Sequence, residues 1–129
     1  MIYNIPLTIP TDTAIASPVR ELQRTVSGEV VALWLTFPPG CAGLVGVRIL
    51  WGTAQIWPTN QEQWFVADGI TFNFPENFEV ARPRYNFVFE GYNLDCLYPH
   101  TIYFRMVVLK QKTNILGQIL NAPQIIKRG

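Results

Sequence analysis

Charged residues are scarce in this sequence. Asp, Glu, Lys and Arg make up 15% of its 129 residues, and the formal net charge is +1. A soluble domain usually has about a quarter of its residues charged, so we expect a partner to cover part of this surface. The basic residues are scattered among acids and form no basic stripe. The sequence therefore predicts no binding of nucleic acid.

Residues with reactive side chains are equally few. Cys41 and Cys96 are the only cysteines, whereas a small secreted domain built on disulfides normally carries more. Two buried free thiols are the favoured interpretation, and a single bridge between them stays open. No phosphate-binding loop, dinucleotide motif or serine-nucleophile elbow is present, so no cofactor is predicted.

A catalytic or metal site has little support from the sequence. His100 is the only histidine, with Asp95 and Cys96 close by in the chain. A metal site needs three or four protein ligands, and a nucleophilic pair needs a third, orienting group. We therefore predict no enzyme, no catalytic residue and no metal ligand, and keep an enzyme centred on His100 and Asp95 as a minor alternative.

Long hydrophobic runs are missing too. The longest, residues 30–35, is far too short to cross a bilayer, and Pro6 and Pro10 interrupt the start where a signal peptide would have its apolar stretch. No membrane partner is predicted. The length favours one domain that can bury a core without disulfides or metal.

Alternating apolar and polar residues recur along the chain, and sustained helical periodicity is nearly absent. This pattern predicts an all-β fold of about seven or eight strands. We expect a single antiparallel β-sandwich, jelly-roll-like, although an immunoglobulin-like strand order stays open. The expected strands include residues 3–9, 19–26, 29–37, 44–51, 70–74, 84–92 and 101–110. The third of these is apolar on both faces and should lie centrally, with both sides covered. In the sixth, Phe87 and Phe89 should face the core and Glu90 should face solvent. The core side of the seventh should carry Ile102, Phe104, Met106 and Val108.

The two ends of the chain are the predicted assembly segments. Residues 1–113 should form the sandwich, with 1–10 as an edge strand or an arm, and 114–129 should be an apolar tail that docks on the sandwich or on a neighbouring subunit. The apolar side chains that would make these contacts are Tyr3, Ile5, Leu7, Ile115, Leu116, Ile119, Leu120, Ile125 and Ile126.

The stretch QIWPTNQEQWF, residues 55–65, carries two of the tryptophans around a Pro-Thr-Asn turn. Exposed tryptophans can stack on the apolar face of a sugar, and Trp57, Asn60, Gln63 and Trp64 would form such a surface. The favoured interpretation is that these rings cap the sandwich or lie in a subunit contact, where Trp is enriched.

Several stretches together resemble small virion proteins of bacterial viruses. They are the opening YNIPLTIPTDT, the run FPPGCAGLVGVRI, the QIWPTN turn and the segment YNLDCLYPHTI, which lie between residues 3 and 108. The resemblance implies a compact jelly-roll-like sandwich that coats or decorates a capsid or forms part of a head fibre.

The residue patterns and the resemblance to virion proteins lead to the same functional prediction. We expect a non-enzymatic structural protein that binds copies of itself, with a trimer favoured, and also a capsid shell, and that is located in the virion after synthesis in the host cytoplasm. The alternative is a carbohydrate-binding module with a glycan as its partner.

Overall fold

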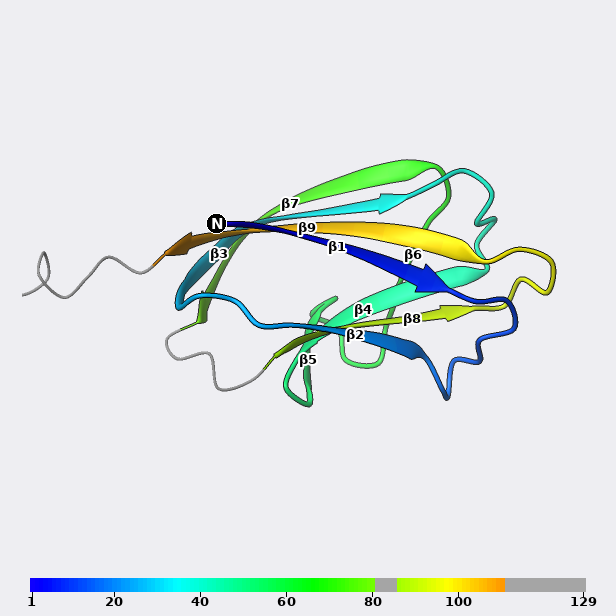
Figure 1. Ribbon diagram of the computed structural model, residues 1–129, viewed down its shortest axis with the longest axis horizontal. Coiled ribbons are helices and arrows are strands. Elements are labelled where there is room, and N and C mark those ends of the chain that lie inside the picture. The colour runs from blue at the N-terminus through cyan, green and yellow to red at the C-terminus, as the bar shows by residue number, and fades with distance from the viewer. Residues whose placement is uncertain (81–85, 111–129) are drawn as a thin grey trace, which may run out of the picture.

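The computed structural model describes residues 1–80 and 86–110, and the regular elements within these ranges are all β-strands. Figure 1 shows them stacked in two layers. The strands are β1 (Ile2–Ile9), β2 (Val19–Gln23), β3 (Gly28–Phe37), β4 (Val45–Trp51), β5 (Ala54–Trp57), β6 (Phe65–Val66), β7 (Ile70–Val80), β8 (Phe87–Asn93) and β9 (His100–Lys110).

The two sheets are antiparallel. The β1 sheet has the strand order β1-β9-β3-β7, and the β2 sheet has the order β2-β8-β4-β5, with β6 pairing with β4 off this path. The chain crosses between the sheets at most of its connections, which is the arrangement of a jelly roll. The predicted all-β sandwich is confirmed, and its strand order is the jelly-roll one.

The core lies between the inner faces of the two sheets. Over most of β1 and β9 every second side chain is apolar and buried, and the side chains between them face outward. This alternation follows from the period of two in a strand. The buried side chains on these two strands are Ile5, Leu7, Ile9, Ile102, Phe104, Met106 and Val108.

β1 is a strand of its own subunit's sheet and does not extend away from it as an arm. β1 pairs with β9 along its whole length and has no other neighbour in the sheet, and such an edge position tolerates Pro6. Ile5 and Leu7 are each 3% exposed, so both pack in the core of their own subunit. The edge-strand interpretation is confirmed, and an exchange of this strand between copies stays a prediction.

The centre of the β1 sheet differs from one expectation. β3 lies between β9 and β7, but its outer face is not covered: Trp34 and Thr36 are partly exposed there. A β-bulge between Val30 and Ala32 shifts the alternation by one residue, so Leu33 and Leu35 point inward. β3 is therefore apolar on both faces for two different reasons. Its inner face lies in the core, and its outer face carries the partly exposed Trp34.

The remaining differences concern the short strands β5 and β6, which were not among the predicted strands, and the ends of β2 and β7. β2 stops at Gln23, three residues before the predicted end, and β7 continues past Pro75, where the sequence predicted an end. β7 is an edge strand with an irregular register at this point, which accommodates a proline.

Some predictions lie outside the described residues. The boundary at residue 113 does, and so do all the tail residues, namely Ile115, Leu116, Ile119, Leu120, Ile125 and Ile126. Among the residues that are described, no helix has the length and apolar character needed to cross a membrane.

Candidate functional site

The loop between β8 and β9, residues 94–99, is tied down by the side chain of Asn93, which is fully buried. Asn93 Nδ2 donates to the backbone oxygens of Ile9, at 3.3 Å, and Tyr98, at 3.0 Å. Its Oδ1 accepts a hydrogen bond from the Asp95 N–H at 2.9 Å. One amide therefore joins the start of the loop to its far end and to β1, in the way that Asn typically closes a turn.

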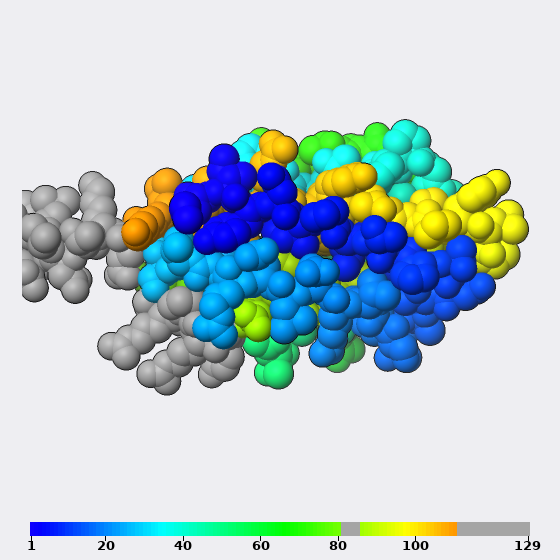
Figure 2. Space-filling view, viewed as in Figure 1, coloured from blue at the N-terminus to red at the C-terminus, as the bar shows by residue number. Residues whose placement is uncertain are grey.

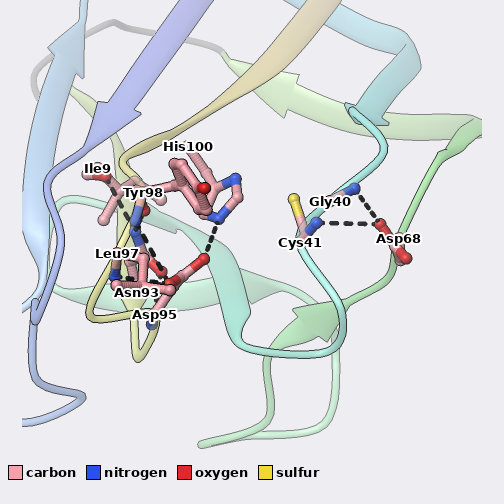
Figure 3. A network of polar contacts seen from close by, with 9 residues as sticks. All are labelled: Ile9, Gly40, Cys41, Asp68, Asn93, Asp95, Leu97, Tyr98 and His100. Atoms are coloured by element: carbon pink, nitrogen blue, oxygen red, sulfur yellow. Dashed lines mark hydrogen bonds and ion pairs between the residues drawn. The ribbon is translucent and has the colours of Figure 1, made fainter.

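The Asp95 carboxylate accepts the hydrogen bonds that hold the middle and end of this loop. Its Oδ1 accepts backbone N–H bonds from Leu97 at 2.8 Å and Tyr98 at 3.3 Å, and its Oδ2 accepts from His100 Nε2 at 2.9 Å (Figure 3). The Asp95 side chain is 12% exposed and that of His100 is 10% exposed. The hydrogen bond from His100, with those from the backbone, holds the pKa of Asp95 below its usual value because they favour the charged form.

This network presents apolar side chains to solvent. Leu94, Leu97 and Tyr98, which we call the loop tip, are 48%, 72% and 64% exposed. In the space-filling view the loop forms the yellow end of the molecule (Figure 2). Apolar residues on a fixed backbone are typical of protein contacts, because little conformational entropy is lost when they bind. Asn93 and Asp95 are residue types that close turns, but no pattern in the sequence marks Leu94, Leu97 and Tyr98 as exposed.

Both cysteines are free in this structure. Cys41 is buried, as expected, whereas Cys96 is exposed in the loop, so the prediction of two buried thiols is wrong for Cys96. Burial, together with the negative charges of Asp68 and Asp95, raises the pKa of the Cys41 thiol. A raised pKa disfavours the thiolate that a nucleophile requires.

The loop between β3 and β4 is also held by a carboxylate, that of Asp68. Asp68 Oδ1 accepts the backbone N–H bonds of Gly40 at 2.8 Å and Cys41 at 3.0 Å (Figure 3). Within the part of the chain that the structure describes, no hydrogen bond joins the Cys41 thiol to His100, and no three His, Cys, Asp or Glu side chains gather as a metal-binding group. The carboxylates at this end of the sandwich shape loops.

Residues 55–65, which we call the tryptophan loop, do not form a sugar-binding platform. Trp57 is 5% exposed and stacks on Phe87 with ring centroids 6.2 Å apart, so its face is closed to a ligand. Trp64 is partly exposed and lies edge-on to Tyr92. The interpretation of Trp57 and Trp64 as paired stacking rings is wrong, because β5 turns Trp57 into the core while Trp64 lies on the outer face of the β2 sheet.

Gln55 organises the rest of that loop. Its Nε2 lies within hydrogen-bonding distance of the backbone oxygens of Pro58, Asn60 and Gln63, at 2.9, 3.0 and 3.1 Å. Its Oε1 accepts the N–H of Glu62 at 3.2 Å. Asn60 and Gln63 therefore contribute backbone oxygens to this loop, while their side chains are exposed.

A buried carboxylate lies under the tryptophan loop, against expectation. Glu90 is 0% exposed on the outer face of β8, so the prediction that it faces solvent is wrong. Arg48 Nε donates to Glu90 Oε1 at 2.8 Å, and Arg20 Nε lies 2.6 Å from Oε2 without hydrogen-bond geometry. The Arg48 guanidinium also lies 4.2 Å from the centre of the Trp64 ring. A folded-back loop thus covers this face and buries its charge.

The outer face of the β1 sheet carries a shallow hollow of about 380 Å³. Trp34 of β3 and Tyr103 of β9 line it, and Tyr103 is 52% exposed. Arg105 Nε donates to Asn4 Oδ1 at 3.0 Å on the same face. The lining residues are Asn4, Ile5, Pro6, Trp34, Thr36, Thr71, Tyr103, Phe104 and Arg105. The exposure of Trp34 was not predicted, because residues 29–37 were expected to be covered on both faces.

Comparison with known proteins adds little to this picture. No protein-family model matches the sequence, and no curated protein matches it. Among solved structures, the chain is similar to the crystal structure of the Yersinia pseudotuberculosis-derived mitogen, with a TM-score of 0.46 and 8% sequence identity over 88% of this chain and 91% of that chain. A similarity at this level carries no inference about function.

Proposed function

We propose that this protein is a non-enzymatic structural protein that binds copies of itself and serves in a virion as a capsid, decoration or head-fibre component. The observation that carries the proposal is the loop tip. Leu94, Leu97 and Tyr98 are apolar and exposed, and the Asp95 hydrogen bonds hold the backbone of Leu97 and Tyr98 in place. A monomer gains nothing from apolar side chains displayed in this way.

The composition supports a protein partner. Charged residues make up 15% of the chain, and the formal net charge is +1, so charge repulsion between copies is weak. The jelly-roll order is compatible with a role in a shell, since viral capsid domains use it, but lectin domains use it as well. The fold alone therefore does not separate the two candidate functions.

The carbohydrate-binding alternative is weaker. Its stacking pair is absent because Trp57 lies in the core. The tip also lacks the neighbouring amides and cations that bind sugar hydroxyls, because the Asn93 amide is already bonded to Ile9 and Tyr98. We therefore keep self-association as the proposal and treat glycan binding as the competing outcome.

Sedimentation velocity tests the proposal. The wild type should sediment as a discrete oligomer, with a trimer favoured. Leu97→Ser together with Tyr98→Ser should raise the dissociation constant by more than about tenfold, because buried aromatic and aliphatic anchors carry most of the energy of a contact. Leu22→Ser is the matched control, since Leu22 is 55% exposed on β2, away from the loop tip. A wild type that remains monomeric at every concentration would contradict the proposal.

The location in a virion needs its own test. Mass spectrometry of purified virus particles should find the chain in amounts comparable to other shell components. Its presence only in the soluble fraction of infected cells, and never in particles, would contradict this part of the proposal while leaving self-association intact.

A further inference from the structure

The outer face of the β1 sheet carries exposed apolar side chains on either side of the hydrogen-bonded pair of Arg105 and Asn4. Tyr103 and Leu109 point outward from β9 and are 52% and 58% exposed. Ile2, which pairs with Val107 across the sheet, is 63% exposed. With Trp34 of β3 these residues form a stripe, the outer-face stripe, that runs from the hollow toward the end of β9. No described segment covers it, whereas the tryptophan loop covers the outer face of the β2 sheet.

Acidic charge lies at one end of the outer-face stripe. Glu29 of β3 pairs in register with Glu79 of β7 and with Leu109 of β9, and both glutamates are exposed. Two like charges directly opposite each other repel, which destabilises the sheet locally. Neither glutamate forms an ion pair with a residue in the described ranges 1–80 and 86–110. A cationic partner at this position would relieve the repulsion.

We propose that residues 114–126 of a second copy bind along the outer-face stripe and fill the hollow between Trp34 and Tyr103. The inference rests on the proposed self-association and names the surface that receives the tail. The segment has the matching chemistry, with apolar residues in its middle and the basic residues Lys112, Lys127 and Arg128 on either side of it. Its apolar residues are Ile115, Leu116, Ile119, Leu120, Ile125 and Ile126.

The position and length of the segment fit this surface. The described chain ends at Lys110 on β9, the strand that lies between β1 and β3 and contributes Tyr103 to the hollow. β9 has 11 residues. At about 3.3 Å per residue, an extended segment from 114 to 126 is longer than β9 and can follow the whole outer-face stripe. The contact would also add the area that the loop tip alone cannot supply, because a stable interface buries about 800 Å² on each partner.

A second copy is the better source of the segment than the same chain. To return over its own sheet, the chain would have to reverse its direction directly after β9. Residues 111–113 are Gln-Lys-Thr and contain neither Gly nor Pro, the residues that favour tight reversals. A neighbouring copy can receive the segment without such a reversal.

Photo-cross-linking of the full-length chain tests the inference. A benzophenone amino acid replaces Leu116, and unlabelled protein is mixed with protein grown on ¹⁵N before irradiation. We expect cross-links to peptides containing Trp34 or Tyr103, with mixed isotope pairs. Tyr103→Ser should reduce their yield by more than about tenfold, because an aromatic anchor is lost. Leu22→Ser, on β2 of the other sheet, is the matched control, since Leu22 is 55% exposed and belongs neither to the outer-face stripe nor to the loop tip.

The outcomes separate this inference from the proposed function. An oligomer in which residue 116 cross-links elsewhere overturns the tail-binding inference and leaves self-association standing. Cross-links to the hollow that never contain mixed isotope pairs show that the tail binds its own chain and overturn the inference as well. Mixed cross-links that persist in the Leu97→Ser, Tyr98→Ser variant support the tail contact even if the loop tip proves dispensable.

Discussion

His100 donates a hydrogen bond to Asp95 at 2.9 Å, from the first residue of β9 back into the loop that precedes it. This bond links the start of β9 to the preceding loop, where the same carboxylate also accepts the backbone N–H bonds of Leu97 and Tyr98. Its role is to fix the shape of a loop that displays apolar residues. The loop tip should consequently respond to any change in the charge of Asp95.

Replacing Asp95 by Asn should lower the free energy of unfolding at neutral pH. The folded-state pKa of Asp95 is lowered, so its stabilising contribution is complete above the unfolded-state pKa of about 3.9 and is lost as the pH falls through the folded value. The difference between Asp95→Asn and the wild type should therefore be full at pH 7 and shrink below about pH 4. Urea unfolding at a series of pH values measures it.

Glu21→Gln is the control for the Asp95 experiment. Glu21 is an exposed carboxylate on β2, and its replacement should change the free energy of unfolding little at any pH. A difference for Asp95→Asn that stays constant down to pH 2 would show that the carboxylate charge does not hold the loop.

Arg48→Ala should be among the more destabilising single changes on the β2 sheet. It leaves the fully buried Glu90 with only Arg20, whose side chain is 63% exposed, as its counter-charge. Removing one partner of a buried ion pair costs about 3 kcal/mol. Combining Arg48→Met with Glu90→Leu should cost much less, because no buried charge is left unpaired and Arg20, which loses its partner, lies mostly in solvent. Chemical denaturation of both variants measures the contrast, and equal losses would contradict it.

The two tryptophans of the loop should differ in their contribution to stability. Trp57→Ala removes a ring that is 5% exposed and should cost about 3–5 kcal/mol. Trp64→Ala removes a partly exposed ring and the contact with Arg48, which together should cost about 1–2 kcal/mol. Thermal unfolding ranks them. A Trp57→Ala variant as stable as the wild type would return this ring to the surface and reopen the sugar-binding interpretation.

The fold was readable from the sequence where burial follows the alternation alone. Ile102, Phe104, Met106 and Val108 on β9 are all buried as predicted, because each contributes to the same core face. Alternation cannot report what covers the outer face of a sheet. For this reason Glu90 was placed in solvent, although the folded-back loop buries it.

The candidate site was only partly predictable. Asn93 and Asp95 indicate a turn by their residue types, and the structure confirms it. The exposure of Leu97 and Trp34 depends on which loop lies over which sheet. That information comes from contacts between distant parts of the chain, and no local pattern carries it.

Cys96 offers the most direct measurement of the central claim, that the loop tip is a contact between copies. It is an exposed free thiol within the loop, while Cys41 is buried and serves as an internal reference. The rate of maleimide labelling of Cys96 is measured at a concentration where the protein is dilute and at one where it is associated. The account predicts much slower labelling of Cys96 in the associated protein. Equal rates in the two states would contradict it.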